Sequence, residues 1–203
     1  MEPYLDRMLD LSLQMEITSS RIRLFQTRQF IVGDQHEYRG AYLGRRIPGL
    51  QSGQASFFHQ ILPHWKRFLR DLGMAVRQKG YQGPLGVDAC LWKDRGGNLK
   101  FKPLIELNPR WTMGRVALDL EKYLAPKTNA GWFFIPLRIV REKGYGDFEE
   151  FASYLKKKYP IQFSGTKRIE SGVVFTNDPK RAQSVLTVLA TLPNPDLAPH
   201  SSS

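Results

Sequence analysis

The feature that most constrains the fold is a pair of apolar, strand-prone segments separated by a short polar turn, at residues 83–93 and 99–110. The turn between them reads Lys-Asp-Arg-Gly-Gly-Asn at positions 93–98, and Gly-Gly followed by Asn is typical of tight turns. We therefore expect an antiparallel hairpin centred on Gly97.

This centre places Asp88 directly opposite Glu106, and Asn108, two residues further on, joins the same face. A slip of one residue would exchange the two faces of the hairpin, so the separation of polar from apolar side chains favours this register. The other face collects only apolar side chains: Val87, Ala89, Leu91, Phe101, Ile105 and Leu107.

Two carboxylates and an amide oxygen on one side of a hairpin form a hard oxygen site. Mg²⁺ is typically bound by one or two carboxylates together with the phosphate oxygens of a nucleotide. Arg110, which follows Pro109, could hold a phosphate or carboxylate bidentately beside the metal. The alternative interpretation is a surface hairpin that carries three unrelated polar residues, and spacing alone leaves it open.

The segments Gly-Pro-Leu-Gly-Val-Asp-Ala (83–89) and Ile-Glu-Leu-Asn-Pro-Arg (105–110) resemble the end of an ATP-grasp catalytic domain. The resemblance covers roughly residues 1–120. It implies that Asp88, Glu106 and Asn108 hold the magnesium of MgATP, with two ions possible, and that Arg110 contacts phosphate or an acyl-phosphate intermediate. The implied fold class is α+β, with an antiparallel sheet packed with helices.

Further nucleotide contacts follow from the same resemblance. The N-terminal residues resemble the adenine-side hinge of the family, where an acidic residue binds the ribose hydroxyls, and Glu2 is the candidate. An exposed terminal acid is the alternative. Arg28 and Arg39 could face the phosphates, although solvated strand arginines are the more usual case.

The composition limits the other classes of function. One Cys excludes a disulfide within the chain, and with only four His a zinc site is not expected. No apolar run approaches the ~20 residues of a membrane span, and no signal-peptide pattern opens the chain, so we expect a cytoplasmic protein without a membrane partner. The net charge of +11 favours anionic partners, but the basic residues are spread along the chain, so we do not expect strong nucleic-acid binding.

The remaining pattern predicts alternating strands and helices. A helix begins at Ser56 and ends near Gly80, and Pro63 either kinks it or marks its true start. Asp147 and Glu150 form the pattern of a capping box at a later helix, and Asp178-Pro179 indicates a last helix running through Leu189. The other expected elements are strands at 10–17, 22–32, 38–43, 132–140 and 172–176, and a helix at 116–124.

We expect three regions: an ATP-grasp C-terminal lobe at 1–125, a small α/β extension at 126–192, and a disordered tail at 193–203. In the family a smaller lobe with phosphate-holding lysines comes earlier in the chain. Because this chain starts at the hinge, we expect that lobe to be absent or supplied by a second chain.

The leading hypothesis is therefore the ATP- and Mg²⁺-binding half of a ligase that joins a carboxylate to an amine or similar nucleophile. The alternatives are a non-catalytic interaction protein that retains the fold and a basic nucleic-acid-binding module.

Overall fold

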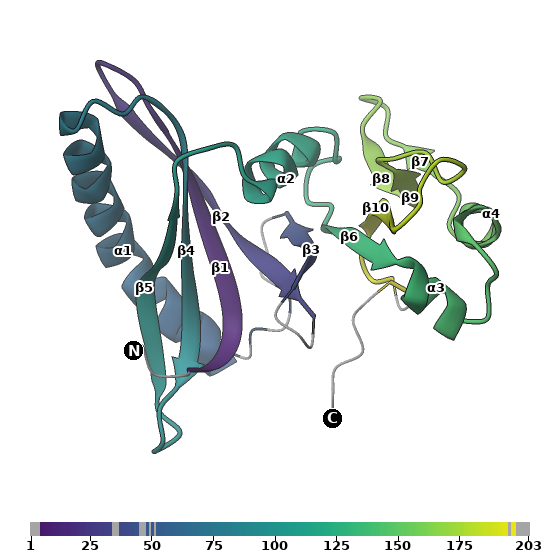
Figure 1. Cartoon of the computed structure of the whole chain (residues 1–203), viewed down its shortest axis with the longest axis horizontal. Helices are drawn as coiled ribbons and strands as arrows, with labels where there is room; N and C mark the ends of the chain where they lie inside the picture. Colours follow the sequence, from purple (N-terminus) through teal and green to yellow (C-terminus); the bar gives the residue numbers. More distant parts are fainter. Residues whose placement is uncertain are drawn as a thin grey trace. The chain divides into compact units, whose positions relative to one another are not determined.

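The computed structural model describes residues 5–33, 37–44, 48, 50, 52–194 and 196–197. It divides into two compact units, each described separately here (Figure 1). Unit 1 comprises Met1–Phe30 and Ile47–Val116, and unit 2 comprises Ile31–Arg46 and Ala117–Ser203. This division differs from a boundary at residue 125, because residues 31–46 group with the C-terminal part of the chain.

Unit 1 is built on an antiparallel sheet with the strand order β5-β4-β1-β2. The strands are β1 (Asp6–Ile17), β2 (Ile22–Val32, whose last two residues fall in unit 2), β4 (Gly83–Lys93) and β5 (Leu99–Asn108). The strands predicted at 10–17 and 22–32 are confirmed. Alternation along β1 produces a two-faced sheet, because one set of side chains is apolar and fully buried: Leu11, Leu13, Met15 and Ile17.

Helix α1 (Ser52–Gln78) covers the apolar face of this sheet (Figure 1). It begins before Ser56 and includes Pro63, so a helix start at Pro63 is excluded. Proline removes one hydrogen bond and crowds the carbonyl one turn earlier. This side chain is exposed, and His59, one turn earlier, is exposed as well. The buried core contains Phe58, Trp65 and Leu69 of α1, with Leu9, Leu11, Leu13, Met15, Ile17, Leu85, Val87, Ala89 and Leu91 of the sheet.

The predicted hairpin is confirmed, with Asp88 opposite Glu106 and Gly86 opposite Asn108. Nearer the turn the register shifts, and Cys90 pairs with Lys102. Residues 103–105 of β5 therefore face the single residue Ala89. The excess is two residues, so the assignment of side chains to faces is preserved.

Leu107 lies opposite Val87, as predicted, but the apolar face of the hairpin is not buried along its whole length. Leu107 is 37% exposed, because β5 is the last strand in the sheet of unit 1. Leu104, from the inserted segment, packs against the core.

In unit 2 the strands β3, β6, β10 and β9 pair antiparallel in that order. The core of unit 2 includes Phe133, Val140, Phe151, Leu155 and Leu186. Asp147 caps α4 by accepting a hydrogen bond from the backbone of Glu150, as the capping pattern predicts. The elements are β3 (Tyr38–Leu43), β6 (Ala130–Pro136), α3 (Leu137–Glu142), α4 (Phe148–Lys158), β7 (Gln162–Phe163), β8 (Ile169–Ser171), β9 (Val173–Phe175) and β10 (Val185–Thr191); α2 (Met113–Glu121) begins in unit 1 and ends in unit 2.

Two expected elements of unit 2 are wrong. The strand expected at 132–140 ends at Pro136, and α3 follows it. The helix expected from Asp178 is instead a turn leading into β10. The segment Val185–Thr191 contains four β-branched residues in seven, which favours a strand. Pairing with β6 on one side and β9 on the other overrides the helical spacing of its apolar residues.

The C-terminal segment, where we expected disorder, packs against α4 as far as it is described. The carboxylate of Asp196 accepts a hydrogen bond from Tyr159 Oη at 2.7 Å and lies 2.9 Å from Lys158 Nζ. Leu197 is buried in the core of unit 2. Residues 195 and 198–203 lie outside the described residues. Among the described helices, none has the length and apolarity needed to cross a membrane.

The contact between α1 and the edge strand β5 generates a stability prediction. The side chain of Trp65 is 2% exposed, and its Nε1 donates to the carbonyl of Pro103 at 2.9 Å. Trp65→Phe leaves this carbonyl without its donor, so we expect a loss of about 1–3 kcal/mol in the free energy of unfolding. Urea unfolding followed by circular dichroism measures it. Phe68→Tyr, on the exposed side of α1, should change the free energy by less than about 0.5 kcal/mol, and equal effects of both substitutions would contradict the assigned contact.

Candidate functional site

A row of polar side chains crosses the face of the unit 1 sheet that α1 does not cover. Arg28 on β2 pairs with Ser12 on β1, Ser12 pairs with Asp88 on β4, and Asp88 pairs with Glu106 on β5. Directly opposite residues in an antiparallel sheet share a face. The register of the four strands therefore aligns one cation, one hydroxyl and two carboxylates.

Asp88, Asn108 and Arg110 form a connected set at one end of this row. Asn108 Nδ2 donates to Asp88 Oδ2 at 3.1 Å, and Asn108 Oδ1 accepts from Arg110 Nη2 at 3.0 Å. Asn108 is 6% exposed, whereas Glu106 is exposed. The structure thus brings together the three predicted metal ligands, Asp88, Glu106 and Asn108, with Arg110 beside them.

The charge of Asp88 is destabilised in this position. The pKa of Asp88 is raised to about 6. Burial is the largest cause, the nearby charges of Glu106 and Asp10 also raise the pKa, and the hydrogen bond from Ser12 and the charge of Arg110 partly offset these effects. Burial disfavours the charged form, and like charges add to this penalty. A cation beside Asp88 and Glu106 would relieve both effects.

The donor set fits Mg²⁺. No group of three or more His, Cys, Asp or Glu side chains is positioned for a metal among the described residues, so the candidate set is two carboxylates and one amide oxygen. Mg²⁺ favours this combination and takes its remaining ligands from water and phosphate. The Oδ1 atom of Asn108 would exchange its hydrogen bond from Arg110 for the cation.

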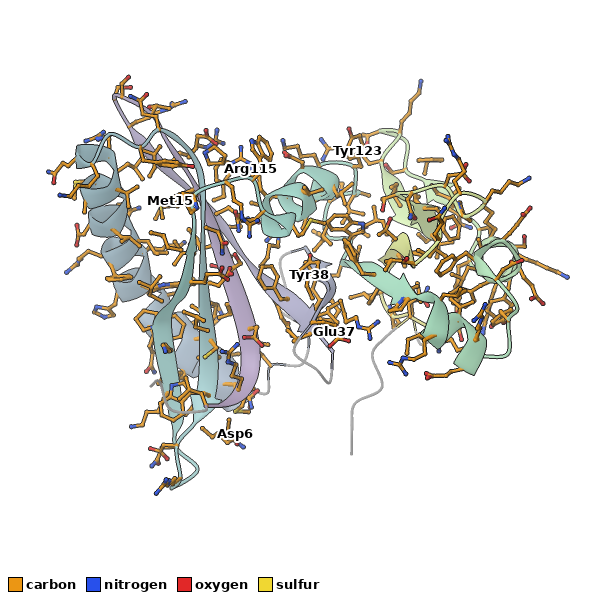
Figure 2. All side chains as sticks on the ribbon, in the orientation of Figure 1. Asp6, Met15, Glu37, Tyr38, Arg115 and Tyr123 are labelled. Atoms are coloured by element: carbon orange, nitrogen blue, oxygen red, sulfur yellow. The ribbon has the colours of Figure 1, made fainter. Side chains whose placement is uncertain are left out.

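The segment that follows Arg110 packs on the same polar face. Thr112 Oγ1 donates to Gln14 Oε1 at 2.8 Å, and Arg115 Nη1 lies 3.2 Å from Glu16 Oε2. The Arg115 guanidinium also lies over the ring of Phe25, 4.0 Å from its centroid. In Figure 2, Arg115 lies on the α2 side of the sheet, opposite the α1 side on which Met15 is buried.

Sequence reasoning missed the residues of β1 on this face. Ser12, Gln14 and Glu16 alternate with the buried apolar residues of the strand, and this alternation is the signal that could have found them. Ser12 and Gln14 are themselves buried, which marks them as part of a polar network and not of a solvated face.

The other predicted nucleotide contacts, Arg28, Arg39 and Glu2, do not all lie in this site. Arg28 belongs to the polar row, and burial lowers its pKa to about 10. It donates to Gln26 Oε1 at 3.1 Å. Arg39 belongs to unit 2, where its Nε donates to Glu37 Oε1 at 2.6 Å. Glu2 lies outside the described residues.

Comparisons with known proteins were made for the sequence and for the structure. The chain matches no established family model. It is 27% identical over 149 residues to a butirosin acyl-carrier protein–L-glutamate ligase of Niallia circulans. The aligned region covers 73% of this chain and 32% of that protein. Among solved structures, a pyruvate carboxylase of Rhizobium etli matches 96% of this chain and 20% of its own length, with a TM-score of 0.50 and 14% identity.

The fold is that of an ATP-grasp domain. The predicted family resemblance and the α+β fold class are confirmed. An L-amino acid ligase of Bacillus licheniformis also matches, with a TM-score of 0.48 and 14% identity, over 93% of this chain and 49% of that chain. The chain spans about a third of the length of the curated relative that it matches.

The raised pKa of Asp88 predicts how the stability of this ATP-grasp unit depends on pH. The folded protein keeps the Asp88 proton up to about pH 6, whereas the unfolded chain loses it near pH 4. Between these values the free energy of unfolding therefore falls as pH rises, and above pH 6 the full penalty of about 3 kcal/mol remains. Asp88→Asn removes the charge, so its stability relative to the wild type should increase from pH 4 to pH 7 by up to that amount.

Urea unfolding at half-unit pH steps from 4 to 8, without divalent cations, measures this difference. Asp71→Asn, at an exposed carboxylate of α1, is the matched control for the loss of one carboxylate. A difference between Asp88→Asn and wild type that stays constant over this range would contradict the assigned environment of Asp88.

Proposed function

We propose that this chain supplies the magnesium- and nucleotide-binding part of an ATP-dependent ligase. The enzyme would activate a carboxylate as an acyl phosphate and join it to an amine or similar nucleophile. The observation that carries the proposal is the opposition of Asp88 and Glu106 across two paired strands, with Asn108 and Arg110 hydrogen-bonded in sequence beside them.

The proposed roles follow from the chemistry of these side chains. Asp88, Glu106 and Asn108 would hold Mg²⁺, which neutralises phosphate charge when bound. Phosphoryl transfer depends on positioning and on charge neutralisation more than on covalent help from the protein. Arg110, which donates to Asn108 here, would then be available to the nucleotide, and its planar guanidinium suits the oxygens of a phosphoryl group.

Other contacts with the nucleotide are proposed from different parts of the chain. Arg28, in the same polar row, would face the phosphates, because a buried guanidinium gains most from an anionic partner. Arg39 and Glu2 are the further candidates, for phosphate and ribose respectively. The rest of the phosphate-binding groups would come from polypeptide beyond these residues or from a second chain, which is consistent with the one-third coverage of the relative.

Metal-dependent nucleotide binding tests this proposal. Titration calorimetry with ATP should show binding in the presence of Mg²⁺ that is at least about tenfold weaker without it. The double substitution Glu106→Gln, Asn108→Ala removes two of the proposed ligands and should abolish this metal dependence, because each charged contact contributes about 1.5–3 kcal/mol. Glu170→Gln, at an exposed carboxylate in unit 2, is the matched control. Binding that is unchanged by the double substitution would refute the metal site.

The role of Arg110 separates binding from chemistry. Arg110→Lys keeps the positive charge but loses the planar bidentate donor. We expect Mg²⁺-dependent ATP binding to change less than about threefold and acyl-phosphate formation to fall about tenfold or more. Trapping with hydroxylamine, in the presence of ATP, Mg²⁺ and a mixture of amino acids, measures the acyl phosphate as a hydroxamate. A parallel loss of binding and of trapping would assign Arg110 to ATP binding alone.

A further inference from the structure

Gln14 is a buried polar residue at the centre of the polar face, and none of the proposed roles uses it. It lies on β1 and is 1% exposed. Two glycines enclose its amide group. A Cβ atom at Gly86 would lie 3.1 Å from Gln14 Oε1, and one at Gly114 would lie 2.7 Å from Gln14 Nε2. The space around this amide is therefore kept open by the absence of two side chains, one from β4 and one from the start of α2.

The amide of Gln14 has a hydrogen-bond partner at each end. Its Oε1 accepts from Thr112 Oγ1 at 2.8 Å, and its Nε2 donates to Ser12 Oγ at 2.7 Å. The Ser12 hydroxyl is in turn hydrogen-bonded to the carboxyl group of Asp88. An ionised carboxylate only accepts, so Ser12 accepts from Gln14 and donates its proton toward Asp88. Every donor and acceptor along this path has a fixed direction.

This path closes a ring of interactions around the candidate site. On one side, Arg110 donates a hydrogen bond to Asn108, and Asn108 donates one to Asp88. On the other side, Thr112 donates to Gln14, Gln14 donates to Ser12, and Ser12 is hydrogen-bonded to Asp88. Arg110 and Thr112 belong to the same short segment, so Gln14 joins the segment that carries the proposed phosphoryl-binding arginine to the proposed metal-binding carboxylate.

We propose that Gln14 is a positioning residue that holds the 110–115 segment and the Asp88 carboxylate in one arrangement for the metal-bound nucleotide. The inference rests on the proposed function, because it assigns Gln14 a role in that same site. Groups that orient metal ligands from behind typically affect metal affinity or activity 10- to 100-fold when they are removed.

The amide satisfies both ends of this connection because it carries a donor and an acceptor. A carboxylate at position 14 accepts from both sides, so Ser12 would donate to residue 14 in place of Asp88, and a third acid would face the site. A thioether of similar size fills the space between the two glycines but forms neither strong hydrogen bond. Gln14→Glu and Gln14→Met therefore separate loss of the hydrogen bonds from loss of volume.

The test measures binding of Mn²⁺·ATP by electron paramagnetic resonance. Mn²⁺ serves as a probe for the proposed Mg²⁺ site. We expect Gln14→Glu and Gln14→Met to weaken Mn²⁺ binding in the presence of ATP about tenfold or more, while ATP binding without metal changes less than twofold. Hydrogen–deuterium exchange over residues 110–116 should increase in both variants.

A matched pair at Thr112 keeps the test decisive where a buried substitution disturbs folding. Thr112→Val removes the hydroxyl that donates to Gln14, and Thr112→Ser retains it. Thr112→Val should increase exchange over 110–116 and weaken Mn²⁺·ATP binding, and Thr112→Ser should restore both to within about twofold of the wild type.

The possible failures are distinguishable. If the wild type shows no metal-dependent ATP binding, the proposed function fails and the role of Gln14 falls with it. If the wild type binds Mn²⁺·ATP and neither the Gln14 variants nor Thr112→Val weaken it, the positioning role is overturned while the proposed function stands. If exchange and stability change without any effect on Mn²⁺ affinity, Gln14 is only structural, and the inference is also overturned.

Discussion

The register of the β4–β5 hairpin, which holds two carboxylates opposite each other, is the constraint on which the polar face of unit 1 depends. Asp88 and Glu106 are fixed by the register of β4 and β5 and cannot separate without breaking strand pairing. Burial is the main cause of the raised pKa of Asp88, and the charge of Glu106 adds to it, because like charges directly opposite are destabilising in a sheet. A cation between the two carboxylates would relieve this cost, and this is the physical basis of the proposed Mg²⁺ site.

Apolar burial on the opposite face of the sheet offsets the free-energy cost of placing these two carboxylates side by side. The apolar side chains that alternate with the polar row in β1 and β4 are buried beneath α1, and their burial favours the register that opposes the two acids. A slip of one residue would place Asp88 and Ser12 in the core and expose its leucines. The stability of the hydrophobic face and the chemistry of the polar face are thus two consequences of a single alternation.

The sequence was sufficient to predict what depends on this alternation and on local turn chemistry. The hairpin, the opposition of Asp88 to Glu106 and the first strands are local patterns, and the structure has them. The last strand, β10, could not be recognised in the same way, because its apolar residues fit a helix equally well and only pairing with β6 and β9 decides. The alternation along β1 indicates that Ser12 and Gln14 share a face, but it does not show which residues they contact. The reason is that β1 and β4 pair across more than sixty residues of intervening sequence.

Gly86 and Gly114 show how a distant part of the sequence is nevertheless adapted to Gln14. Gly114 stands in the first turn of α2, where alanine would be the better helix former by about 1 kcal/mol. A Cβ at this position would press on the Gln14 amide, and one at Gly86 would meet Thr112 Cγ2 at 2.8 Å. Glycine at position 114 therefore lowers the helix propensity of α2 but allows the segment after Arg110 to approach the sheet closely. This close approach brings Thr112 within hydrogen-bonding distance of Gln14. Through Gln14 and Ser12, the segment that carries Arg110 is connected to the carboxylate of Asp88.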